Sequence, residues 1–283
     1  MPVDYKEYCL NEYKRLFASY LAKLPSKKKD KDKRIEAQRN AIKDASVNAI
    51  KAYPNIEPSD IWKTIYIAHV YNIANIEDSK VINAVISADN SWKKSSGHAF
   101  EEMIKELGNL SLKSHDIEII LQKDLSILLK AGAIGNEVRD ISWLKEQIRS
   151  SVFDLYLTIN DQEKRRVFGC VQSKTSIRDR VTRDREPSLQ AMSAFFMSVA
   201  VVLDGDFMKL PKFQYMVNGG SPDYEKNGWH GMYVFSNKDL ENQRIHSINI
   251  TMDKFVAHVI EAAKFWAEQR QWFDHKWKPS SNS

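Results

Sequence analysis

The chain has 283 residues and a mass of 32.7 kDa, and its 43% hydrophobic content excludes a disordered protein. This length leaves room for one large domain or for a domain with a substantial second part. The apolar runs are too short to cross a bilayer and residues 1–8 do not resemble a signal peptide, so we expect a soluble, cytoplasmic protein with no membrane partner. A net charge of +5 permits a polyanionic partner without requiring one.

Residues 1–90 have a helical pattern throughout. Apolar residues recur at helical spacing between Tyr5 and Leu21, and a second helix is predicted over residues 35–52, after a lysine-rich segment at 27–34. Ser59 or Asp60 is expected to cap a third helix, and residues 78–88 favour a short fourth one. This region contains no pattern that indicates catalytic chemistry, so we predict an N-terminal all-helical domain.

Residues 91–283 mix helical and strand patterns and predict an α/β domain. We expect helices near 97–107, at 188–203 with Pro187 in the first turn, and through 255–266. The predicted strands lie at 117–121, 151–159, 167–173, 212–217, 232–235 and 247–250.

Cysteines and histidines give no sign of a metal site. Cys9 and Cys170 lie far apart without metal-type spacing, so we expect both to be reduced and half-buried. No pair among the seven histidines has the spacing of helical metal ligands, and packing explains them better.

The strands at 151–159 and 167–173 are predicted to pair as a hairpin around a charged turn. Side-chain alternation then places Asp154 on one face with Tyr156, and Gln172 together with Lys174 on the second strand. A carboxylate offers a hard oxygen ligand to a divalent cation, and an ammonium can assist an attacking water. These are the needs of phosphodiester hydrolysis, although a surface salt bridge is the simpler alternative for two residues.

The segment after Lys174 is dense in charge, with four arginines and three acidic residues between positions 178 and 186. An arginine can hold guanine O6 and N7 together, and an acidic side chain can accept from the cytosine amino group. The triplet Arg178, Asp179 and Arg180 is therefore a candidate for reading a C/G sequence in DNA. A salt-bridged surface loop is the alternative.

A strand-end lysine followed by Ser and then Arg-Asp-Arg resembles the type II restriction endonucleases of the PD-(D/E)XK superfamily that read CCGG or CCNGG cores. Residues 58–62 and 91–101 are also similar to this group, mainly to its BsaWI-like and more distantly to its AgeI-like members. The resemblance implies a restriction-endonuclease-like mixed β-sheet flanked by helices. It also implies Mg²⁺-dependent cleavage of double-stranded DNA at a CCGG-containing palindrome, by a homodimer or by a higher oligomer on DNA.

By this resemblance Asp154 matches the first metal ligand, and Lys174 matches the lysine that activates or positions the attacking water. Glu101, with Glu102 as its alternative neighbour, matches the acidic helix residue that supports the metal site.

The position two before the lysine departs from the superfamily motif, because Gln172 stands where Asp or Glu is usual. Members of the CCGG group bring the missing carboxylate from beyond the lysine, and both Asp184 and Glu186 are candidates here. The ungapped match favours Asp184. Glu186 directly precedes Pro187, where capping of the following helix is its alternative role, so both residues stay open as the relocated ligand.

For DNA recognition, Arg178, Asp179 and Arg180 match the base-reading triplet of the group, and Lys94, with Lys93 beside it, matches a basic residue before the acidic helix. The BsaWI-like resemblance implies A or T on both flanks, giving WCCGGW. Residues 1–90 would then support dimerisation or DNA grip, and residues 91–283 would form the catalytic and DNA-recognition domain.

Three other functions are compatible with the sequence. A nuclease of the same superfamily could grip phosphates without reading bases, and an inactive DNA-binding module could have lost its metal site at Gln172. A helical scaffold with incidental motifs is the third.

Overall fold

The computed structural model describes residues 4–25, 29–74, 81–161, 164–175, 181–203 and 210–280. Its chain divides into two compact units, Met1–Met103 and Ile104–Ser283. The sequence analysis placed a boundary near residue 90, and both positions fall within one long helix, α4 (Val81–Leu112).

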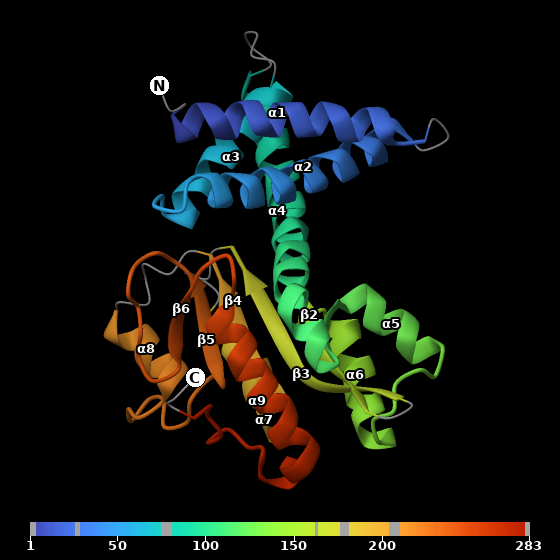
Figure 1. Ribbon diagram of the computed structural model, residues 1–283, viewed down its shortest axis with the longest axis vertical. Helices are drawn as coiled ribbons and strands as arrows, with labels where there is room; N and C mark the ends of the chain where they lie inside the picture. The colour runs from blue at the N-terminus through green and yellow to red at the C-terminus, as the bar shows by residue number, and fades with distance from the viewer. Residues whose placement is uncertain are drawn as a thin grey trace. The chain divides into compact units, whose positions relative to one another are not determined.

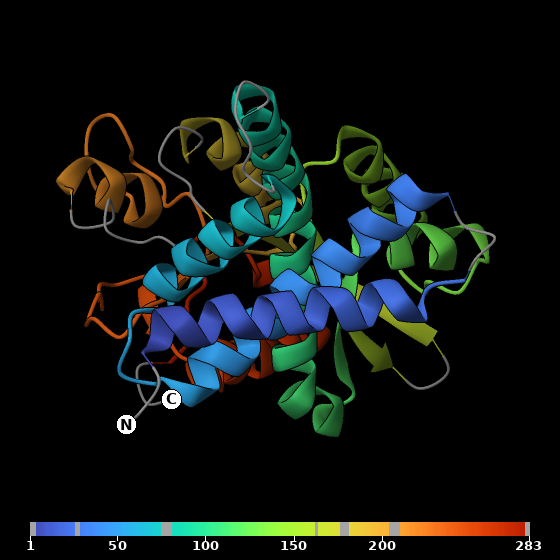
Figure 2. The same ribbon diagram turned by 90° about the horizontal axis from the view of Figure 1, so that it is seen from above.

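The first unit is helical, and its helices pack pairwise around a shared core (Figure 2). Before α4 come α1 (Tyr5–Lys23), α2 (Asp30–Ala52) and α3 (Pro58–Ala74). The Tyr13 hydroxyl lies 2.7 Å from His69 Nδ1 inside this core, where neither side chain is exposed. Trp62 makes edge contacts with both Trp92 and Phe100, which ties α3 to α4. The first three predicted helices are confirmed, and α2 begins earlier than expected, within the lysine-rich segment. The expected cap of the third helix is wrong, because α3 begins at Pro58 and Ser59 and Asp60 lie inside it.

Helix α4 corrects the expectation of two separate helices near 78–88 and 97–107. It runs unbroken through Gly97, where an added Cβ would meet nothing within 4 Å. Apolar residues at helical spacing, including Ala99, Phe100 and Met103, are fully buried and hold this stretch in the core. No helix in the described ranges is long and apolar enough to span a membrane.

The second unit contains a mixed sheet whose spatial order follows the chain order (Figure 1). Its strands are β1 (Ile117–Leu121), β2 (Leu155–Asp161), β3 (Lys164–Lys174), β4 (Met197–Val202), β5 (Gly231–Phe235) and β6 (Ile245–Ile248). The pairs β1–β2 and β2–β3 are antiparallel, whereas β3 to β6 are parallel. This arrangement confirms the predicted mixed sheet flanked by helices.

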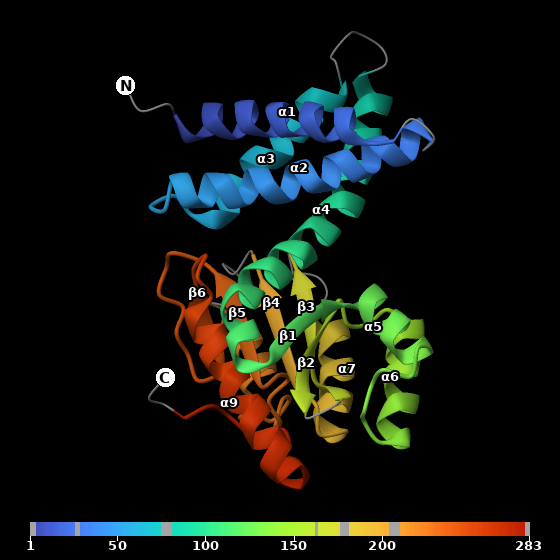
Figure 3. The same cartoon turned by 45° about the vertical axis from the view of Figure 1, so that its right-hand side comes forward.

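Helices cover both faces of the sheet (Figures 1 and 3). They are α5 (Gln122–Lys130), α6 (Val138–Ser150), α7 (Val181–Ser193), α8 (Pro211–Asn218) and α9 (Asp253–Gln269). Leu125 of α5, Leu144 of α6 and Ala191 of α7 share one cluster with Cys170 of β3. On the other face, α9 places Phe255 against Tyr233 and Trp266 against Phe168. Both cysteines are reduced, as expected, but they are completely buried rather than half-buried.

The predicted helix at 188–203 is wrong over its second half. Helix α7 ends at Ser193, Phe195 adopts a left-handed φ of 61°, and the apolar residues that follow form β4. Every residue of β4 is buried, as in a central parallel strand covered on both faces. Pro187 also lies inside α7 rather than at its first turn.

The strand expected at 212–217 is a helix, α8, which begins at Pro211. Phe213, Met216 and Val217 pack into one core cluster, and their i, i+3, i+4 spacing is that of a helical face. The remaining predicted strands are present within a few residues of their expected limits.

Candidate active site at the β2–β3 hairpin

Asp154 and Lys174 lie side by side where the hairpin of β2 and β3 begins and ends. Asp154 Oδ2 accepts hydrogen bonds from the Ser173 backbone N–H at 2.7 Å and from Lys174 Nζ at 3.3 Å. Only 21% of the Asp154 side chain and 16% of the Lys174 side chain are exposed. Because a backbone donor also fixes the carboxylate, the pair differs from a mobile ion pair on the surface.

The backbone around Asp154 explains how the two groups meet. The Asp154 N–H donates to the Val171 carbonyl at 3.1 Å, and the Asp154 carbonyl accepts from the Gln122 N–H at 3.1 Å. Asp154 is thus tied to β3 and to the start of α5. The sequence analysis placed Asp154 within the strand beside Tyr156, but β2 begins only at Leu155 and Asp154 occupies the bend before it.

Gln172 is a buried structural link on the same strand. Its Oε1 accepts a hydrogen bond from Trp229 Nε1 at 2.8 Å, and its Nε2 donates to the backbone carbonyl of Asp184 at 3.0 Å. The side chain has no exposed surface. The amide therefore uses its donor and its acceptor to connect β3 with α7 and with Trp229, and a carboxylate could not supply the donor.

Helix α7 carries both candidates for the missing carboxylate, on different sides. Positions 184 and 186 are separated by about 200° around an α-helix of 3.6 residues per turn. Asp184 is half-buried and its carbonyl is held by Gln172, whereas Glu186 is exposed. Glu186 lines a cavity of about 360 Å³ together with Arg139, Asp140 and Trp143 of α6. Since α7 begins at Val181, Glu186 lies within the helix and is not its N-cap, which corrects the capping alternative.

The arginine-rich segment is described in part. Arg178, Asp179 and Arg180 lie outside the described residues, so their base-reading role stays a prediction. Arg185 has a structural role, because it donates to the carbonyls of Met216 at 3.1 Å and Lys226 at 2.5 Å and stacks on Tyr224. The density of arginines after Lys174 therefore reflects packing as well as any contact with a ligand.

The sequence analysis missed Arg185 and Trp229 as residues that hold the site together. Both contacts join segments more than thirty positions apart, with separations of 31 and 57 residues for Arg185–Met216 and Trp229–Gln172. A sequence pattern within one segment cannot predict a hydrogen bond between residues that are this far apart in the chain.

The remaining predicted residues belong to the first unit. Glu101 Oε2 lies 3.2 Å from His98 Nδ1, and this hydrogen bond raises the pKa of His98. Glu102 lies 3.6 Å from the Arg39 guanidinium. Lys93 Nζ lies 2.5 Å from Asp89, whereas Lys94 lines a groove beside α2. The participation of Glu101 and both lysines in the site stays a prediction.

The donor chemistry suits a hard cation, since the candidates Asp154, Asp184 and Glu186 offer only carboxylate oxygens. Across the described ranges, no group of three or more His, Cys, Asp or Glu side chains is arranged to hold a metal ion. Mg²⁺ commonly binds through one or two carboxylates, several waters and substrate phosphates, so a full protein cage is not required. The residues present therefore fit Mg²⁺ better than zinc.

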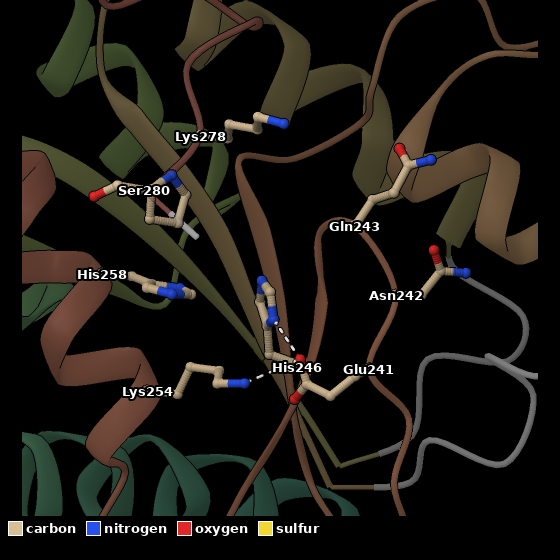
Figure 4. A pocket seen from close by; sticks show the side chains of 9 residues that line it. Glu241, Asn242, Gln243, His246, Lys254, His258, Lys278 and Ser280 are labelled. Carbon is tan, nitrogen blue, oxygen red and sulfur yellow. Dashed lines mark hydrogen bonds and ion pairs between the residues drawn. The ribbon is translucent and has the colours of Figure 1, made fainter. Parts of the chain in front are cut away.

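A separate cavity of about 390 Å³ lies beside β6 and contains none of the predicted site residues (Figure 4). His246 Nδ1 lies 3.0 Å from Glu241 Oε2, and Lys254 Nζ lies 3.1 Å from the same atom. Burial lowers the pKa of His258 to about 4, and its Nδ1 lies 2.9 Å from the Tyr233 hydroxyl. These imidazoles have packing partners, as the sequence analysis expected of the histidines.

Comparison with known proteins gives concordant matches. The family model for "BsaWI restriction endonuclease type 2" matches residues 137–272. A crystal structure of a pre-specific complex of restriction endonuclease BsaWI with DNA has 52% sequence identity to the chain, covers 99% of it and 100% of BsaWI, and gives a TM-score of 0.70.

A second relative is more distant. Type II restriction enzyme AgeI from Thalassovita gelatinovora is 29% identical over 195 residues, which are 65% of the chain and 63% of AgeI. The chain thus matches less than two thirds of the length of this curated relative. The crystal structure of an AgeI–DNA complex is 20% identical, covers 89% of the chain and 91% of AgeI, and has a TM-score of 0.58, which supports the fold alone.

Proposed function

The chain belongs to the BsaWI family of type II restriction endonucleases, and we propose that it hydrolyses phosphodiester bonds in double-stranded DNA at a palindrome that contains CCGG. The observation that carries this proposal is the fixed Asp154–Lys174 pair, in a chain that is 52% identical to BsaWI over its full length. BsaWI was crystallised in a complex with DNA, and the same partner is proposed for this chain.

We propose Mg²⁺ as the cofactor, held by Asp154 and by Asp184 or Glu186, with Glu101 as a supporting acidic residue. Bound Mg²⁺ would polarise a phosphoryl oxygen and lower the pKa of the attacking water. Lys174 would orient that water and offset the charge that develops on the phosphate. The Ser173 N–H and Lys174 Nζ both bind Asp154 Oδ2, so the orientation of this carboxylate is set before substrate arrives.

Gln172 makes the α7 carboxylates the natural source of a second ligand. A neutral amide is a poor ligand for Mg²⁺, and both polar ends of this amide are engaged with protein groups. Because its Nε2 binds the Asp184 carbonyl, it holds the start of α7 next to the end of β3. The helix could then supply the carboxylate that the strand lacks.

For sequence recognition we propose Arg178, Asp179 and Arg180 as the base-reading residues, with Lys94 and Lys93 contributing to DNA binding. A palindromic target read by identical half-sites implies a twofold-symmetric homodimer, in which the first unit would support dimerisation or DNA grip. The BsaWI relationship favours WCCGGW as the full site. Such a restriction enzyme would act in the cytoplasm.

Gln172 is also the observation that favours a second candidate function, a DNA-binding module that does not cleave. If neither Asp184 nor Glu186 reaches the metal, the hairpin would supply Asp154 without a second carboxylate from α7, and binding would persist without hydrolysis.

The test uses three short duplexes that contain WCCGGW, CCGG flanked by G or C, or no CCGG. Each is incubated with the protein in Mg²⁺ and in EDTA, and binding and cleavage are measured separately. Mg²⁺-dependent cleavage of the first duplex alone supports the whole proposal, and cleavage of both CCGG duplexes removes only the flanking preference. Equal cleavage of all three duplexes indicates a nonspecific nuclease. Binding of DNA without cleavage indicates the inactive module. If the protein neither binds nor cleaves any duplex, the proposal is overturned.

A further inference from the structure

A groove of about 380 Å³ lies within the first unit, between the beginning of α2 and the middle of α4. We name it the basic groove. It is lined by Lys31, Arg34, Ile35, Gln38, Ile73, Ser87, Asn90, Ser91, Lys94 and Ser95. Lys31 and Arg34 are three positions apart on α2 and therefore lie on the same face of that helix.

The groove is strongly positive. Lys31, Arg34 and Lys94 give three positive charges, and no acidic side chain lines it among the described residues. Two nearby acids are paired with lysines outside the lining, since Asp30 lies 3.5 Å from Lys33 and Asp89 lies 2.5 Å from Lys93. Asp32 and Glu36, also near in sequence, do not line the groove. None of the three lining cations has an ion-pair partner among the residues that the structure describes. The charge of the groove is thus available to an anion.

Polar groups from α2 and α4 line the groove, and two of them, Gln38 and Ser95, are buried. Ser91 Oγ donates to Gln38 Oε1 at 2.8 Å, which fixes the Gln38 side chain between the two helices. Ser95 is only 2% exposed, and its Oγ has no hydrogen-bond partner within the described residues. An unpaired buried hydroxyl is costly, and a ligand oxygen in the groove would satisfy it. Ile35 and Ile73 add an apolar surface suited to a sugar ring.

We propose that the basic groove binds a backbone phosphate of the DNA, with Lys31, Arg34 and Lys94 around the phosphate oxygens and Ser95 donating to one of them. The proposal rests on the proposed function and assigns Lys94 to the DNA backbone instead of a base. Three cations around one cavity recognise charge and not base edges, so this contact adds affinity without sequence preference.

The test compares wild type with the triple variant Lys31→Ala, Arg34→Ala, Lys94→Ala. Dissociation constants are measured without divalent metal for a CCGG duplex and for a duplex lacking CCGG, over a range of KCl concentrations. Each phosphate contact contributes about 0.9 to the slope of log affinity against log salt, so loss of the one proposed phosphate should lower the slope by about 0.9. The loss in affinity should be the same for both duplexes.

A matched control removes three exposed lysines of the same unit that do not line the groove, in Lys6→Ala, Lys14→Ala, Lys51→Ala. This control has the same net charge as the groove variant and should keep the wild-type slope. Ser95→Ala should weaken wild-type binding and have a smaller effect in the triple variant, because the hydroxyl and the cations would share one phosphate. An unchanged slope in the triple variant, or an equal loss in the control, overturns the proposal.

Inorganic phosphate separates failure of this inference from failure of the proposed function. If wild type bound no duplex, the DNA function would fail, and the groove would be tested by the Tm in added phosphate. A Tm increase in wild type that is absent from the triple variant would identify free phosphate as the ligand instead of DNA. An equal response of both proteins would show that the groove binds no phosphate at all.

Discussion

At the scale of single residues, the central feature of the site is the contact between the side chains of Asp154 and Lys174. They are twenty positions apart, and the hairpin brings the Lys174 ammonium to 3.3 Å from the Asp154 carboxylate. The sequence predicted this proximity because a hairpin is a local structure with a fixed alternation of side chains. It could not predict that Ser173 donates its backbone N–H to the same carboxylate oxygen, since that bond depends on the bend before β2.

Removing either member of the pair should abolish cleavage while leaving DNA binding intact. For Lys174→Ala we expect a rate loss of about 10²- to 10⁴-fold, the usual contribution of a group that assists proton transfer or charge stabilisation. Asp154→Asn should bind DNA in EDTA with nearly wild-type affinity, as measured by electrophoretic mobility shift. Lys164→Ala, an exposed lysine at the other end of β3, is the control, and a fully active Lys174→Ala would remove the catalytic assignment.

Asp184 and Glu186 should respond differently to neutralisation, because they face different directions from α7. We expect one of the variants Asp184→Asn and Glu186→Gln to lose cleavage on the order of 100-fold or more, as for loss of a group that supports a metal, and the other to remain close to wild type. Single-turnover rates at saturating Mg²⁺ decide between them. Full activity in both variants would mean that the second carboxylate does not come from α7.

At the scale of elements, Gln172 links three segments that the sequence presents separately. The sequence shows that Gln172 departs from the motif of the superfamily that the chain resembles. It does not show that the Gln172 side chain links β3 to Trp229 and to α7. Trp229 is 57 residues away, and the bond to the Asp184 carbonyl requires the crossover from β3 through α7 to β4. The buried amide thus has a physical reason to occupy this position.

Gln172→Leu should raise the Mg²⁺ concentration needed for half-maximal cleavage, because it releases the Asp184 carbonyl and loosens the start of α7. Trp229→Phe removes the bond to Gln172 Oε1 and some buried ring volume, but it leaves the bond from Gln172 to the Asp184 carbonyl in place. Each variant leaves a buried polar group unpaired and should lose about 1 to 3 kcal/mol of unfolding free energy in urea titrations. Only Gln172→Leu should shift the Mg²⁺ dependence, and identical Mg²⁺ curves for the two variants would reduce Gln172 to a packing residue.

The segment from Ser193 to Leu203 shows why some elements could not be predicted. From Ala194 onward its residues are apolar except for Ser198, and such a run fits a buried helix as well as a central parallel strand. The sheet decides the outcome, because β4 pairs with β3 on one side and with β5 on the other. The same dependence on tertiary packing made a helix of residues 211–218, where Met216 and Val217 enter the core.

His230 links β4 to the C-terminal segment and should make the second unit sensitive to acid. Its Nδ1 accepts from the Ser198 N–H at 3.0 Å, and its Nε2 donates to the Asp274 carbonyl at 2.8 Å, so the ring is held neutral. Burial lowers the pKa of His230 to about 3. The unfolded chain gains a proton below pH 6.5 or so and the folded chain does not, so stability is lost as the pH falls from there towards about 3.

His230→Gln removes this titration while keeping an acceptor and a donor. The variant should be less stable at pH 7, but the dependence of its unfolding free energy on pH should be weaker by up to about 1.4 kcal/mol per pH unit between roughly pH 6 and 4. Urea titrations over this range measure the slope. The same slope in wild type and variant would show that His230 is not buried in its neutral form.

At the scale of the whole molecule, the change from a helical to a mixed pattern predicted two parts, and the family resemblance implied a mixed sheet, but neither could locate the division between the parts. The boundary expected near residue 90 and the structural division after Met103 both lie within α4, which is one continuous helix. Helical periodicity does not change where a helix passes from one compact unit to the next. The sequence also cannot state how two copies assemble, and the proposed homodimer rests on the symmetry of a palindromic target.

The most direct measurement of the central claim is to sequence the fragment ends produced from phage DNA by the purified protein, in Mg²⁺ and in EDTA. We predict discrete ends at CCGG palindromes in Mg²⁺ and none in EDTA, with A or T at the flanking positions. The same experiment would give the cut position and the overhang. Ends scattered without regard to sequence, or DNA left intact in Mg²⁺, would contradict the assignment of this chain as a site-specific endonuclease.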